Sequence, residues 1–99
     1  MKDLEAIRTV QAEAVEVKTV VDTAQNFALS GRPCMISNTG AQPAYINPAG
    51  TATAANGFLV AAGTTLPIKF TVSPSVNSGN LSVISNATGT TVAVMYFDL

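Results

Sequence analysis

Short apolar runs separated by turn-forming residues make up most of the chain after residue 22. The separators include Asn38-Thr39-Gly40, Asn56-Gly57 and Thr88-Gly89, where Gly and Asn permit the positive φ that tight turns require. Runs of this kind, rich in β-branched and aromatic residues, are typical of strands. The pattern therefore predicts strands at residues 27–29, 34–37, 44–46, 58–60, 66–72, 81–85 and 91–97.

Residues 15–22 have the two-residue period of a further, half-buried strand. Its alternating sets are Val15, Val17, Thr19 and Val21 against Glu16, Lys18, Val20 and Asp22. With this strand the chain has about eight, at the short spacing of a jelly-roll-like β-sandwich or barrel. Proline cannot donate to a sheet ladder, so we expect Pro43 at a strand start and Pro67 at an edge or bulge.

The last predicted strand, residues 91–97, carries no charged residue. A strand without charge is expected in the centre of a sheet or beneath a neighbouring subunit, with both faces covered. The two-residue period divides it into a face of Val92, Val94 and Tyr96 and a face of Thr91, Ala93, Met95 and Phe97.

The N-terminal segment has a different, helical spacing. Asp3 can cap a helix, Glu5 suits its first turn, and an apolar stripe recurs at every third residue. That stripe consists of Leu4, Ile7 and Val10. The spacing predicts a short amphipathic helix to about Ala14, so the chain divides into an arm, residues 1–14, and a β body, residues 15–99.

A longer helix is an alternative, because a heptad-like spacing continues past Ala14. It runs through Ile7, Val10, Ala14, Val17, Val21, Ala24 and Ala28. β-Branched residues in such a seam favour a trimeric coiled coil. The strict alternation from Val15 onward favours the shorter helix.

Composition limits the classes of function. The 99 residues have room for one domain, and 47% of them are hydrophobic. The net charge of −1 offers no basic patch, so a nucleic-acid partner is not expected. No apolar stretch approaches a membrane span of about 20 residues, and the N-terminus lacks an apolar signal core. We expect synthesis in the cytosol without a membrane partner.

Residues for catalysis are scarce. The chain has no histidine and one cysteine, which removes imidazole-based nucleophile activation and the usual zinc sites. No phosphate-binding glycine motif is present. Cys34 lies in an apolar run and is expected to be a buried thiol, and the acids of the first quarter are expected on a solvated face. We expect no enzyme, no cofactor and no metal site.

Aromatic residues leave one ligand hypothesis open. Tyr45, Phe58, Phe70, Tyr96 and Phe97 could stack on a sugar, although aromatic residues in strands more often form the core. After residue 22 only Arg32, Lys69 and Asp98 are charged. A body covered by Ser, Thr, Asn and Gly suits close contact with other protein.

Two stretches resemble a type of small tailed-bacteriophage virion protein. The first is a strand that leads through Asn38-Thr39-Gly40-Ala41 into a strand containing Tyr45, followed by residues 53–63. The second is a closing strand after Ala87-Thr88-Gly89. The resemblance covers residues 33–97 and implies a β-sandwich or jelly-roll subunit that decorates a capsid or belongs to a fibre or tail.

Together, pattern and resemblance predict a virion structural protein, a capsid decoration (cement) subunit made in the host cytoplasm. Its expected partners are the major capsid protein, other virion proteins and further copies of itself, as a homotrimer. Leu4, Ile7 and Val10 are the candidate partner-binding residues, unless their stripe docks on the chain's own body. The alternatives are a head-fibre or tail component with a receptor- or glycan-binding domain, and an unrelated cytosolic β protein.

Overall fold

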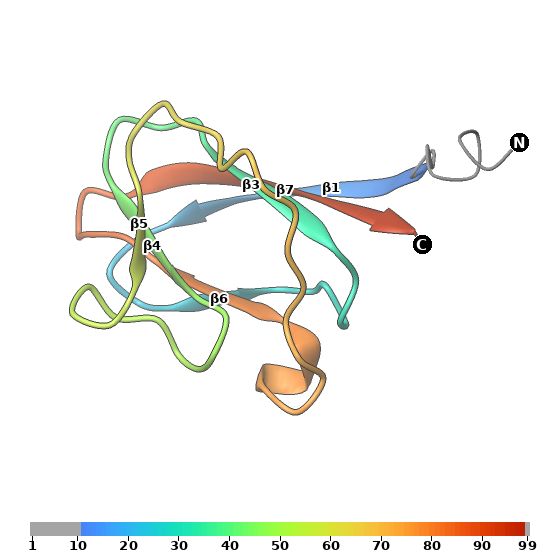
Figure 1. The fold of residues 1–99 in the computed structure, drawn as a ribbon. Helices are drawn as coiled ribbons and strands as arrows, with labels where there is room; N and C mark the ends of the chain where they lie inside the picture. Colours follow the sequence, from blue (N-terminus) through green and yellow to red (C-terminus); the bar gives the residue numbers. More distant parts are fainter. Residues whose placement is uncertain (1–10, 99) are drawn as a thin grey trace, which may run out of the picture.

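Two antiparallel sheets face each other in the computed structural model, which describes residues 11–98 and the side chains of residues 14–97 (Figure 1). The three-stranded sheet has the order β1-β7-β3, and the four-stranded sheet has the order β2-β6-β4-β5. The chain is mainly β and forms a β-sandwich. The strands are β1 Gln11–Val20, β2 Gln25–Phe27, β3 Cys34–Asn38, β4 Ala44–Asn47, β5 Phe58–Val60, β6 Leu81–Ile84 and β7 Thr90–Asp98.

The core between the sheets is apolar, and none of its members is charged. Val92 and Val94 of β7 belong to it together with Leu81 and Val83 of β6, and all four side chains are fully buried. The inward positions recur at every second residue, which is why the strands alternate between buried and half-buried residues. The buried thiol of Cys34 belongs to this core, as its sequence neighbours predicted.

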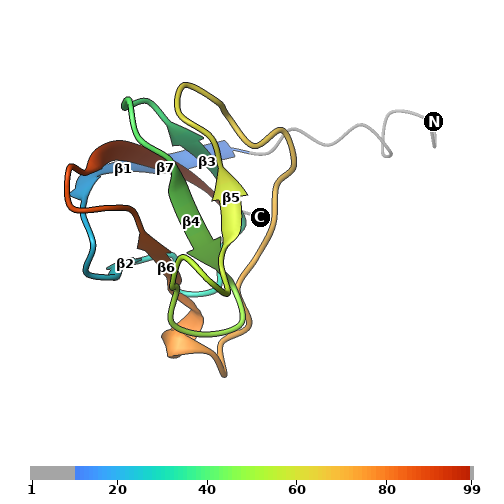
Figure 2. The ribbon, with the colours of Figure 1, turned by 90° about the vertical axis from the view of Figure 1, so that its left-hand side faces the viewer.

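An irregular segment, residues 63–70, covers the free edge of β3. Near Asn38 it makes regular bonds, from Asn38 N to Thr64 O (2.8 Å) and from Leu66 N to Ile36 O (2.9 Å). Further along, Cys34 and Phe70 exchange bonds of 2.9 and 3.1 Å in a register shifted by two residues. The shift makes a bulge beside Pro67, and Figure 2 shows this segment running past β5 and down the side of the sandwich.

Most predicted strands are confirmed, and β7 lies in the centre of its sheet as expected. Pro43 directly precedes β4, and Pro67 lies in the edge bulge. The strand predicted at residues 66–72 is wrong, because the bulge leaves only isolated bridges there. The strand predicted at 27–29 lies instead at Gln25–Phe27.

The helix predicted to reach Ala14 is wrong for residues 11–14, which belong to β1. The register between β1 and β7 shifts between Ala12 and Ala14, opposite Phe97 and Tyr96. This bulge adds one residue and interrupts the two-residue period before Val15, so the alternation did not reveal the first part of β1. The coiled coil through Ala28 is also wrong, since Val17 lies in β1. Residues 1–10, with Leu4, Ile7 and Val10, lie outside the described residues.

The two turn motifs that carry the virion resemblance form one polar cluster at an end of the sandwich. Asn38 is fully buried, and its Nδ2 donates to Gln42 O (2.7 Å) and Val60 O (2.9 Å). Its Oδ1 accepts from Gly40 N (3.2 Å) and Thr90 Oγ1 (2.7 Å). The bond to Val60 O joins β3 to β5 in the other sheet, and the other three fix the turn after β3 and the start of β7. The Asn-Thr-Gly motif therefore has a structural role.

Candidate interaction surfaces

The outer face of the three-stranded sheet, here called the valine face, is partly apolar and carries no charged residue. It consists of Val15, Val17 and Thr19 of β1, Met35 and Ser37 of β3, and Thr91, Ala93 and Met95 of β7, which the registers place side by side. Val15 and Val17 are 59% and 60% exposed. The remaining members of β3 and β7 are half-buried. Among the described residues, one face of β7 is therefore covered as predicted, and the other is partly open.

The opposite face of β1 carries the polar residues Glu16 and Lys18, which cover the open side of the sandwich. Tyr96 Oη donates to Glu16 Oε1 (2.7 Å), and Ala28 N donates to the same oxygen (3.1 Å). Lys18 Nζ lies 3.1 Å from Glu16 Oε2. Arg32 stacks on the Tyr96 ring at 4.5 Å and donates to Leu29 O (2.8 Å). Glu16 was expected on a solvated face; its side chain is 23% exposed in this cap, so it is only partly solvated.

Ionisation of Glu16 is coupled to this cap. Burial opposes the charged carboxylate, but the hydrogen bonds from Tyr96, Ala28 and Lys18 outweigh it and lower the pKa of Glu16 below 4.5. Burial and the bond to Glu16 raise the pKa of the Tyr96 hydroxyl above 10.0. Burial alone raises the pKa of Cys34 to about 12. Cys34 is therefore a protonated core residue and a poor nucleophile.

Removing the Tyr96 hydroxyl, by Tyr96→Phe, is expected to lower the free energy of unfolding by about 1 kcal/mol near pH 7. The lowered folded-state pKa of Glu16 contributes stability that is present above the ordinary pKa of 4.5. This stability is lost as the pH falls through the folded-state pKa. The difference between wild type and variant should therefore shrink toward about pH 3 in urea unfolding. Tyr45→Phe, in the other sheet, is the control. An unchanged difference at both pH values would contradict coupling to the Glu16 carboxylate.

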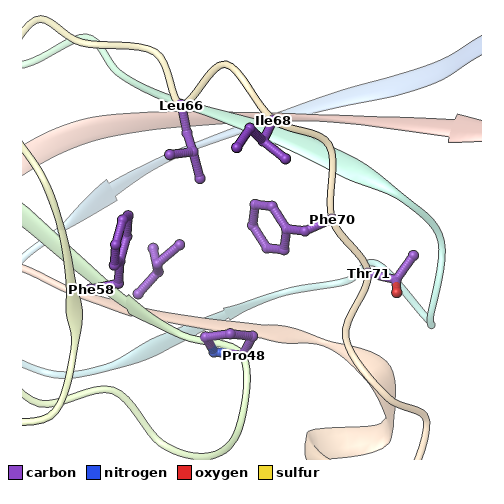
Figure 3. Close-up of a pocket in the computed structure, with 7 residues that line it drawn as sticks. Pro48, Phe58, Leu66, Ile68, Phe70 and Thr71 are labelled. Atoms are coloured by element: carbon purple, nitrogen blue, oxygen red, sulfur yellow. The ribbon is translucent and has the colours of Figure 1, made fainter.

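The second candidate surface is an apolar groove of about 320 Å³ between β5 and the edge segment. In Figure 3, Phe58 lies across from Phe70, with Leu66 and Ile68 above and Pro48 below. Ile46 forms part of the lining, and Thr71 is its one polar residue. Phe58 and Ile68 are 59% and 67% exposed, so the groove is open at its mouth.

The five aromatic residues proposed as a sugar platform do not come together. Phe58 and Phe70 share the groove, whereas Tyr96 and Phe97 are buried in β7. Tyr45 pairs with Leu59 on the outer face of the four-stranded sheet. A groove with one hydroxyl offers few hydrogen-bond partners to a sugar. Its chemistry fits an apolar occupant.

Other chemistry is sparse in the part of the chain that the structure describes. No group of three or more His, Cys, Asp and Glu side chains gathers there in a way that could hold a metal ion. No helix among these residues is long and apolar enough to cross a membrane. Comparison with family models, curated proteins and solved structures finds no match to the chain.

The sequence interpretation did not identify either surface. The predicted partner-binding residues Leu4, Ile7 and Val10 lie outside the described residues. The valine face had a usable signal, since Val15 and Val17 alternate with Glu16 and Lys18 and one of the two sets had to face outward. The groove had no such signal, because its residues come from β4, β5 and the edge segment.

Proposed function

We propose that this chain is a virion structural protein, a capsid decoration subunit that binds assembled capsid protein through its valine face. The observation that carries the proposal is the exposure of Val15 and Val17 beside uncharged, partly apolar neighbours. Exposed apolar side chains on a face without charge gain free energy when another protein covers them. Such a subunit needs no catalytic group, since it stabilises the shell through the surface area buried at the contact.

The strand order adds support. The edge segment beside β3 completes a second layer of four, β1-β7-β3 plus residues 63–70, opposite β2-β6-β4-β5. All connections except that between β4 and β5 pass from one layer to the other. We infer a jelly roll in which the bulged segment, between β5 and β6, takes the place of one of the eight strands. Jelly rolls are common in viral capsid proteins, although the fold alone does not determine the function.

The size of the valine face favours a lattice over an isolated pair. Three strands about 4.8 Å apart and about 3.4 Å per residue give this face a planar area of about 240 Å². A stable pair buries about 800 Å² on each partner. A single contact of this size is weak, but contacts repeated by the symmetry of a shell act together through multivalency. The subunit would therefore prefer assembled capsid to free capsid protein.

The direct test is the number of copies in purified particles, measured by quantitative mass spectrometry. Many copies support decoration, a handful would indicate a fibre or tail component, and absence from particles would refute a virion role. A glycan-binding fibre is less favoured, because the groove has one polar lining residue.

Val17→Asp tests the binding face. Because Val17 is 60% exposed, the charge should change the free energy of unfolding by no more than about 1 kcal/mol. It should nevertheless reduce incorporation into particles by at least about tenfold, since a carboxylate would be buried at the contact. Leu59→Asp, the same change on the outer face of β5, is the matched control. Equal incorporation of both variants would overturn the assignment of the valine face.

A further inference from the structure

Within residues 11–98, the groove between β5 and the edge segment is open at its mouth. Phe58 and Ile68 stand more than half exposed at its mouth, while Ile46 in its lining is only 3% exposed. The lining contains no charged side chain. Apolar surface of this kind gains free energy when aliphatic or aromatic groups displace water from it.

The chain itself contains an apolar stripe of suitable size. Leu4, Ile7 and Val10 recur at every third residue in the segment directly before β1. The groove, with a volume of about 320 Å³, has room for several aliphatic side chains. A stripe of three aliphatic residues is too short to form a stable helix alone, so it requires a surface.

The topology separates this stripe from the groove of the same chain. Val10 adjoins Gln11, the first residue of β1, at one edge of the three-stranded sheet. The groove lies beyond the opposite edge, with β7 and β3 in between and the edge segment as its wall. Three strand spacings of about 4.8 Å place that wall about 14 Å away, whereas consecutive Cα atoms are about 3.8 Å apart. Because Val10 directly precedes β1, the complete stripe cannot lie in the groove of its own chain.

We propose that the groove formed by β5 and residues 66–71 binds the stripe of Leu4, Ile7 and Val10 from a second copy of the chain. Each copy gives one stripe and receives one, which is a head-to-tail contact that closes into a ring, such as a trimer, when the rotation permits. This contact joins copies to one another and goes beyond the proposed binding to capsid, which uses the valine face.

Sedimentation velocity of the purified full-length chain tests the proposal. The wild type should form a closed oligomer, and Ile7→Asp and Ile68→Asp should each weaken association by at least about 100-fold. Leu59→Asp, also on β5 but facing away from the groove, should leave association unchanged. Both Ile68 and Leu59 are more than half exposed, so thermal unfolding should confirm that the variants are folded. A monomeric wild type, or an oligomer insensitive to Ile68→Asp, would overturn the proposal.

A cross-linking experiment identifies which chain supplies the stripe. Two variants, Ile7→Cys and Ile68→Cys, are mixed and oxidised, while the buried thiol of Cys34 stays protected. A disulfide between the two different variants is the expected result. If instead the double variant cross-links within one chain and the mixture does not, the groove binds its own arm and the exchange between copies is refuted.

This outcome is independent of the capsid proposal. Loss of the oligomer in Ile68→Asp without loss of particle binding supports the groove contact alone. Loss of particle binding in Val17→Asp with an intact oligomer supports the valine face alone.

Discussion

Asn38→Asp is expected to lower the free energy of unfolding by about 3 to 5 kcal/mol, which would remove a large part of the stability of a domain of this size. The substitution replaces an amide that donates to Gln42 O and Val60 O with a carboxylate facing the same two carbonyl oxygens. The site is fully buried, so water cannot solvate the new charge. Thermal unfolding should show a midpoint lower by more than about 12 °C.

Asn47→Asp is the matched control for that substitution. Asn47 is half-buried, and its Oδ1 accepts one bond, from Ala49 N at 2.8 Å. A carboxylate keeps this acceptor, so the free energy of unfolding should change by less than about 0.5 kcal/mol. Similar losses for Asn38→Asp and Asn47→Asp would contradict a special role for the buried amide.

Gly79→Ala is expected to cost about 3 kcal/mol, the second-largest effect. Gly79 has φ +79°, a conformation that costs an L-residue about 1 to 2 kcal/mol. A Cβ at this position would also lie 2.5 Å from Gly31 N and 3.1 Å from Gly31 Cα. Backbone cannot swing aside as a side chain can, and the 3.0 Å bond from Gly31 N to Gly79 O would be disturbed. Overpacking adds about 1 to 3 kcal/mol.

Two other glycines separate the conformational cost from the steric one. Gly63 has φ +73° but open space at its Cβ position, so Gly63→Ala should cost only about 1 to 2 kcal/mol. Gly50 has neither feature, and Gly50→Ala should be neutral or slightly stabilising. Chemical denaturation measures all three. If Gly79→Ala and Gly63→Ala lose the same stability, the close approach of Gly31 is not important.

Local patterns were sufficient to predict most of the strands. The run Phe58–Val60 is a strand with the predicted bounds, and β7 extends the predicted run by one residue at each end. These segments combine a two-residue period with glycine or asparagine turns, which are both short-range signals. The β-sandwich could be predicted because many such segments agreed with one another, and the two sheets confirm it.

Pairing between distant residues explains what the sequence could not predict. Whether Val17 or Glu16 faces inward depends on Tyr96, at the other end of the chain, whose hydroxyl requires a partner. The apolar run at residues 66–72 looked like a strand, but Pro67 and the two-residue register shift exclude a regular ladder there. The groove is lined by residues from separate segments of the chain, so no periodic pattern in the sequence marks it.

The bulged segment along β3 also determines which kinds of contact the molecule can make. A straight sheet edge is a template on which strands of other chains add indefinitely, as they do in cross-β fibres. Here the backbone groups of Asn38, Ile36 and Cys34 at the edge of β3 already form hydrogen bonds with residues 64–70. This outer segment contains a proline and changes register. A foreign strand meets no continuous row of donors and acceptors on that side. Association at this edge must therefore depend on the fit of side chains, which discriminates between partners, instead of on the backbone that every protein shares.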